Sequence, residues 1–173
     1  MRSGVVLLLL GACVAVPVPS AAQLPAGGES APPPPPVPLA QQRFLQGLKT
    51  AGRGVAQLKY GIDRLNRAQG VHDSAQVVLA SRRLVGMCSA ARGFLVSGRG
   101  QMQPTAYEAP TLKPARDLVF QLDSLTQSVK DCLSTKGQLP PTVSPGLATR
   151  LHAYDTALAG FRTAIGLPNK PSN

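Results

Sequence analysis

Residues 39–67, LAQQRFLQGLKTAGRGVAQLKYGIDRLNR, contain the most regular pattern in the chain. Apolar residues or alanine recur there at alternating intervals of four and three positions, and basic residues fall between them. That period places the apolar residues on one side of an α-helix and leaves a charged side for solvent. The stretch predicts a long amphipathic helix whose apolar side comprises Phe44, Leu48, Ala51, Val55, Leu58, Ile62 and Leu65.

A second helix is expected to begin after Asp73, a residue suited to accept hydrogen bonds from first-turn amides, with Gln76 completing a capping box. It runs to about Gly98 or beyond, and residues 98–110 form the one long internal connection because their glycines and prolines interrupt the period. The apolar side of this helix comprises Val77, Ala80, Leu84, Met87, Cys88, Ala91, Phe94 and Leu95.

Two further helices follow with the same period. One begins near Pro114 and ends at a Gly137 cap, and the other has Ser144 as its N-cap and closes at Gly166. Their apolar sides comprise Ala115, Leu118, Leu122, Leu125, Val129 and Cys132 in the former, and Leu147, Leu151, Tyr154, Leu158, Phe161 and Ile165 in the latter.

Four sustained heptad patterns predict an all-α fold, a left-handed four-helix bundle over residues 39–166. Short links make the first and second helices antiparallel, and likewise the third and fourth. No alternation of polar and apolar residues is long enough to indicate a β-strand.

The N-terminal region predicts export. Residues 1–22 have a basic residue, an apolar run too short to span a bilayer, and a small-residue cleavage site, which is the order of a signal peptide. An alternative is a lipoprotein anchored through Cys13, in the lipobox-like sequence LGAC. Residues 23–38, with five consecutive prolines, predict an extended flexible linker, and residues 167–173 a disordered tail. The mature chain is expected to be periplasmic or extracellular.

After removal of the signal peptide the chain carries a net charge of +9, of which residues 23–103 contribute +7 and residues 104–173 contribute +2. The first two helices therefore carry most of the positive field. They are expected to form one basic interaction surface, unless the charge serves only solubility. Its members are Arg53, Lys59, Arg64, Arg67, Arg82, Arg83, Arg92 and Arg99.

The field favours an anionic partner outside the cytoplasm. An acidic surface on an envelope protein or membrane-complex subunit, or anionic lipid headgroups, would satisfy it. Nucleic acid is excluded as a partner, because the exported chain has few aromatic residues and no Trp to stack on bases. No transmembrane helix is expected in the mature chain.

Cys88 and Cys132 remain after processing and both fall on apolar helix sides. An even, low cysteine count in an oxidising compartment predicts one disulfide, here between the second and third helices. The alternative is two free, buried thiols that act only as small apolar side chains.

Gly47, Gly54 and Gly61 recur every seven residues in the first helix and so form one line beside its apolar side. Each helical glycine costs about 1 kcal/mol relative to alanine, so the line indicates close approach. It predicts either tight packing of a neighbouring helix or a groove for a partner's helix or an apolar ligand.

No metal, cofactor or catalytic site is predicted. His72 and His152 fall off the apolar sides, and the two glutamates, Glu29 and Glu108, lie in expected loops or tails. Asp117, Asp123, Asp131 and Asp155 are expected on helix exteriors beside basic neighbours such as Arg116 and Lys130. No phosphate-binding loop or nucleophile elbow occurs. The chain is expected not to be an enzyme.

These observations predict a non-enzymatic interaction or adaptor protein of the bacterial envelope, which docks its basic helical surface on an anionic partner. A carrier that binds an apolar small molecule or cofactor in the bundle core is the alternative. Visible colour or a co-purifying ligand would favour the carrier.

Overall fold

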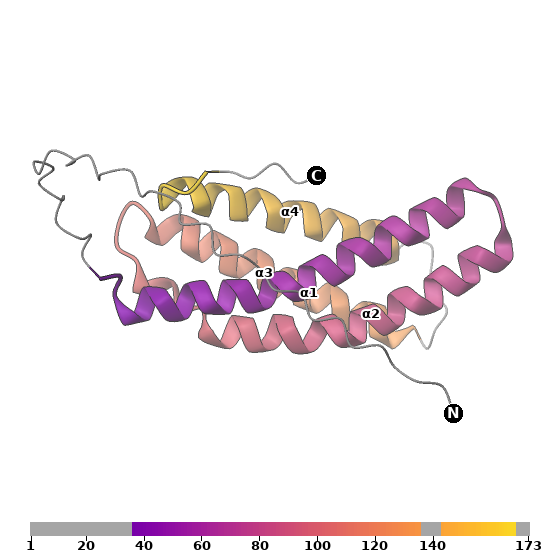
Figure 1. Cartoon of the computed structure of the whole chain (residues 1–173), viewed down its shortest axis with the longest axis horizontal. Helices are drawn as coiled ribbons and strands as arrows, with labels where there is room; N and C mark the ends of the chain where they lie inside the picture. The colour runs from indigo at the N-terminus through magenta and orange to yellow at the C-terminus, as the bar shows by residue number, and fades with distance from the viewer. Residues whose placement is uncertain (1–35, 136–142, 169–173) are drawn as a thin grey trace, which may run out of the picture. The chain divides into compact units, whose positions relative to one another are not determined.

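The computed structural model describes residues 36–135 and 143–168. The predicted signal peptide, Cys13, nearly all of the proline-rich linker, the Gly137 cap and most of the predicted tail lie outside the described residues. The described part forms an all-α four-helix bundle, as predicted, and no strand occurs within it (Figure 1). Its elements are α1 (Leu39–Gly70), α2 (Ser74–Gln101), the 3₁₀ turn η1 (Pro104–Ala106), α3 (Leu112–Ser134) and α4 (Val143–Ala164).

Helices α1 and α2 form a long antiparallel hairpin. The first helix continues three residues beyond its predicted end, to Gly70, and His72 then adopts a left-handed conformation with a φ of 56° in the turn. Asp73 caps α2 as predicted: its Oδ1 accepts hydrogen bonds from the Ala75 and Gln76 amides at 2.9 and 3.2 Å. The turned end of this hairpin extends beyond the ends of α3 and α4 (Figure 1).

The predicted connection at 98–110 is wrong in its first part. Helix α2 passes through Gly98 and ends at Gln101, and η1 occupies part of the remainder. Gly98 is a buried helical residue of α2 rather than the end of the helix. Because it has no side chain, its backbone packs directly against α1. Helix α3 then begins two residues before Pro114, which therefore lies in the first turn, where its missing amide hydrogen is not needed.

The start of α4 also differs from the prediction. Val143 is already helical, and Ser144 is a buried helical residue rather than an exposed N-cap. The following proline still lies in the first turn, so it does not disturb the helix. The predicted end is confirmed: Gly166 has a φ of 73°, its amide donates to the Thr163 carbonyl, and the Leu167 amide donates to the Arg162 carbonyl.

The predicted apolar sides form the core. All six predicted positions of α3 are buried, and six of the seven in α1, the exception being the partly buried Leu48. The core also contains Met102 and Tyr107 from the connection between α2 and α3. Tyr107 joins Phe44 and Phe161 in an aromatic cluster whose ring centroids lie 5.1 to 5.3 Å apart.

A disulfide joins α2 to α3. Cys88 and Cys132 are both fully buried, and their Cα atoms lie 6.4 Å apart. Eleven residues later in α2, Arg99 pairs with Asp123 of α3, which precedes Cys132 in the sequence. The two helices therefore run antiparallel. The disulfide thus connects the α1–α2 hairpin to the α3–α4 hairpin.

Candidate functional site

The glycines of α1 lie against α2. An added Cβ would come within 2.5 Å of the Gly98 carbonyl oxygen at Gly47, 2.9 Å of the Ala91 carbonyl oxygen at Gly54, and 2.7 Å of Leu84 Cδ1 at Gly61. Contacts this short leave no room for a side chain. The line of glycines is therefore occupied by a helix of the same chain, and it is not an open groove for a partner.

The eight predicted basic residues do not form one continuous free surface. Lys59 Nζ lies 2.7 Å from Asp155 Oδ2 of α4, and Arg99 Nε lies 2.8 Å from Asp123 Oδ1 of α3. The two ion pairs bind opposite edges of the hairpin to its neighbours, because α4 lies on one side and α3 on the other. These two pairs could not be predicted, since sequence spacing does not show which carboxylates the neighbouring helices bring close.

The other six basic residues divide by position along the hairpin. Arg53 and Arg92 are exposed far from its turned end, and Arg92 borders a shallow depression with Gly93 and Val96. Arg64, Arg67 and Arg83 are brought together near the turn, where they line a hollow of about 380 Å³ between α1 and α2. The sixth residue, Arg82, is exposed on α2 but does not line this hollow. The remaining lining residues are Ala68, Val71, Gln76, Leu79 and Ala80.

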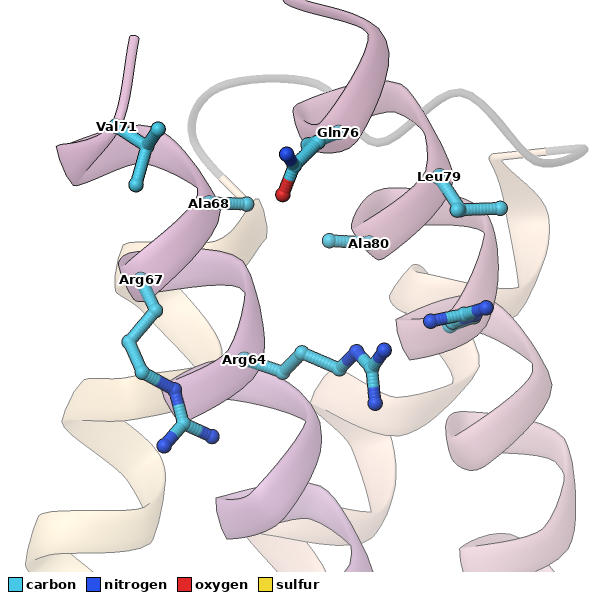
Figure 2. A pocket seen from close by; sticks show the side chains of 8 residues that line it. Arg64, Arg67, Ala68, Val71, Gln76, Leu79 and Ala80 are labelled. Carbon is cyan, nitrogen blue, oxygen red and sulfur yellow. The ribbon is translucent and has the colours of Figure 1, made fainter. Parts of the chain in front are cut away.

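We call this hollow, with the exposed residues around it, the tip site. Figure 2 shows Arg64 extending from α1 across the hollow towards α2, and Arg67 running along the outside of α1. Ala68 and Ala80 face each other above the Arg64 side chain, and the Gln76 side chain lies above them (Figure 2). Arg64 Nη1 also donates to the Tyr60 hydroxyl, at 3.4 Å.

The tip site combines positive charge with exposed apolar side chains. Val71 and Leu79, which line the hollow, are 67% and 49% exposed. Within residues 36–135 and 143–168, neither Arg64, Arg67 nor Arg83 forms an ion pair with a carboxylate. The nearby carboxylate of Asp73 accepts two backbone hydrogen bonds at the start of α2. The arginines of the tip site are therefore available to an anion.

The described residues contain no group of three His, Cys, Asp or Glu side chains placed to hold a metal ion. His72 and His152 are both exposed, one in the turn before α2 and the other on α4. None of the described helices is long and apolar enough to cross a bilayer.

Comparison of the chain with known protein families, with curated proteins and with solved structures finds no match. The chemistry of its surfaces is therefore the basis for assigning a function.

Proposed function

We propose that the chain is an exported, non-enzymatic interaction protein that docks the tip site on an anionic membrane surface. The observation that supports this most directly is the exposure of Val71 and Leu79 beside three arginines without carboxylate partners. Apolar side chains enter the boundary between headgroups and acyl chains, while arginines bind lipid phosphates. An acidic protein surface would also match the charge and could bury the apolar groups, so capture of such a protein is the alternative outcome of the test below.

The position of the tip site suits this role. The end of the α1–α2 hairpin extends beyond α3 and α4, so a flat surface can reach it without meeting the rest of the bundle (Figure 1). Each arginine near an anionic leaflet contributes about 1 kcal/mol to binding. Three arginines and a few apolar side chains give reversible binding that weakens as salt is added.

Vesicle binding tests the proposal. The protein is expected to co-sediment with vesicles of equal parts phosphatidylglycerol and phosphatidylcholine, and not with vesicles of phosphatidylcholine alone. Changing Arg64, Arg67 and Arg83 to glutamine should weaken binding about a hundredfold, at about 1 kcal/mol for each arginine. A matched control changes Arg53, Arg92 and Arg150 to glutamine, which removes the same charge from exposed sites elsewhere.

The control triple variant should retain most of the binding. Equal weakening by the two triple variants would show that the whole positive surface attracts the membrane and that the tip site has no special part. Failure to bind either vesicle, together with salt-sensitive capture of an acidic envelope protein, would replace the lipid by a protein partner. A Leu79→Ser variant should weaken binding more than Val96→Ser, which changes a similarly exposed residue of α2 away from the tip.

Export is supported by the pattern of residues 1–22. The mass of the mature N-terminus distinguishes the two processing routes. Cleavage before Gln23 gives a free periplasmic or extracellular chain, whereas an acylated Cys13 at the new N-terminus gives a lipid-anchored one. In the anchored form the tip site would add a contact with anionic headgroups to the contact made by the lipid anchor.

A further inference from the structure

A second surface site lies between α1 and α4, the neighbouring helices that contact each other least. They leave a groove of about 430 Å³, a volume typical of small-ligand sites. Leu45 and Leu48 of α1 and Leu158 of α4 give it an apolar, partly buried lining. Gly52 also lines the groove, and a Cβ added there would meet no atom within 4 Å, so there is open space next to these leucines.

The charges of the groove are distributed unevenly along its length. Phe44 contacts Phe161, and Lys59 pairs with Asp155, so α1 and α4 run antiparallel. The Lys59–Asp155 pair closes one end of the groove with no net charge. Lys49 and Arg162 line the groove toward the other end, and neither has an ion-pair partner among the described residues.

A buried hydroxyl adjoins this groove. Tyr154 lines it but is only 1% exposed, and its hydroxyl has no hydrogen-bond partner within residues 36–135 and 143–168. Burial raises the pKa of Tyr154, nearby Asp155 raises it further, and Arg162 acts in the opposite direction. The hydroxyl therefore remains protonated and can donate a hydrogen bond close to the charged lining.

We propose that the α1–α4 groove binds a single-chain amphiphile with an anionic head group, such as a fatty-acid carboxylate. The head group lies at Lys49 and Arg162, where a carboxylate forms charge-assisted hydrogen bonds. The chain lies along Leu48 and Gly52 toward the Lys59–Asp155 pair. From Leu45 to Lys59 the groove follows about 20 Å of α1, which accommodates an extended acyl chain.

An anionic amphiphile accounts for the apolar lining and the positive end together. A neutral apolar ligand would leave Lys49 and Arg162 without a role, and a small anion would leave the leucines exposed to water. The groove shares no lining residue with the tip site, so the two proposals stand independently.

Filling the groove tests the proposal. Laurate is a suitable probe, and its binding is measured by titration calorimetry on the mature chain. Gly52→Leu places a side chain in the open space and is expected to reduce laurate affinity by more than about tenfold, since the leucine replaces the acyl chain at the lining. Gly93→Leu is the matched control, because it changes a helical glycine with equally open surroundings on α2, outside the groove.

Both substitutions replace a helical glycine by a better helix former, so both variants should fold, which circular dichroism verifies. Full laurate affinity in Gly93→Leu together with its loss in Gly52→Leu supports the groove. Equal affinities in the two variants, or no binding of laurate by the unsubstituted chain, would overturn the proposal.

The head-group position is tested by charge. Arg162→Gln should weaken laurate binding about tenfold, the usual effect of removing a hydrogen bond to a charged group. It should leave dodecanol, the uncharged alcohol of the same chain length, unaffected. Equal weakening of both ligands would overturn the placement of the head group. The variant lacking Arg64, Arg67 and Arg83 should bind laurate normally even if it no longer binds vesicles, which separates this site from the tip site.

Discussion

Replacing Cys88 and Cys132 together by alanine is expected to lower the free energy of unfolding by about 4 kcal/mol. The bond joins residues 44 positions apart, and a cross-link of that span removes much of the conformational freedom of the unfolded chain. Domains of this size are typically stable by only about 5 to 15 kcal/mol, so the loss is large. Urea unfolding followed by helical circular dichroism measures it.

A reducing agent provides the control for this experiment. It should destabilise the unsubstituted chain by a similar amount and leave the double alanine variant unchanged. A chain equally stable with and without the reducing agent would contradict the contribution assigned to the disulfide.

Replacing Gly98 by alanine is expected to lower the free energy of unfolding by about 2 to 3 kcal/mol. The added methyl group would lie 2.5 Å from the Gly47 carbonyl oxygen and 2.6 Å from the Ala51 amide nitrogen. These are backbone atoms, so α1 and α2 must separate to accept it. Separation weakens the packing of neighbouring core residues such as Leu95.

Gly93→Ala is the matched control, five residues earlier on the same helix. A Cβ at Gly93 meets nothing within 4 Å, so only the better helix propensity of alanine acts there. This control should raise the free energy of unfolding by up to about 1 kcal/mol. Thermal or urea unfolding of the pair thus gives changes of opposite sign. If both substitutions were stabilising, α1 and α2 would not be in the close contact described above.

The helices and most of the core could be predicted from the sequence because each apolar side is a local, periodic signal. Positions such as Leu58, Leu122 and Phe161 are fully buried, as their spacing indicates. Met102 and Tyr107 could not be predicted, since they lie in a connection without a regular period. Tyr107 is buried where its ring packs on Phe44 of α1 and Phe161 of α4. Gly98 was misleading because glycine ends many helices but also permits close helix packing.

The candidate site was only partly predictable. The sequence shows that the first two helices are basic, but it does not show how the helices are rotated toward their neighbours. For this reason the pairing of Lys59 with Asp155 and of Arg99 with Asp123 was missed. The proximity of the tip arginines could have been predicted from the sequence. Residues near 64 and 83 lie on both sides of one short turn, so an antiparallel hairpin brings them together.

The α1–α2 and α3–α4 hairpins meet at two edges, α2–α3 and α1–α4, and different interactions join the helices at each edge. At the α2–α3 edge a covalent bond fixes the separation, whereas the α1–α4 edge relies on one ion pair and the contact of two rings. Thermal opening of the bundle is therefore expected to widen the α1–α4 edge more than the α2–α3 edge. The proposed amphiphile would then enter the α1–α4 groove without global unfolding, and reduction of the disulfide would remove the covalent constraint on the opposite edge.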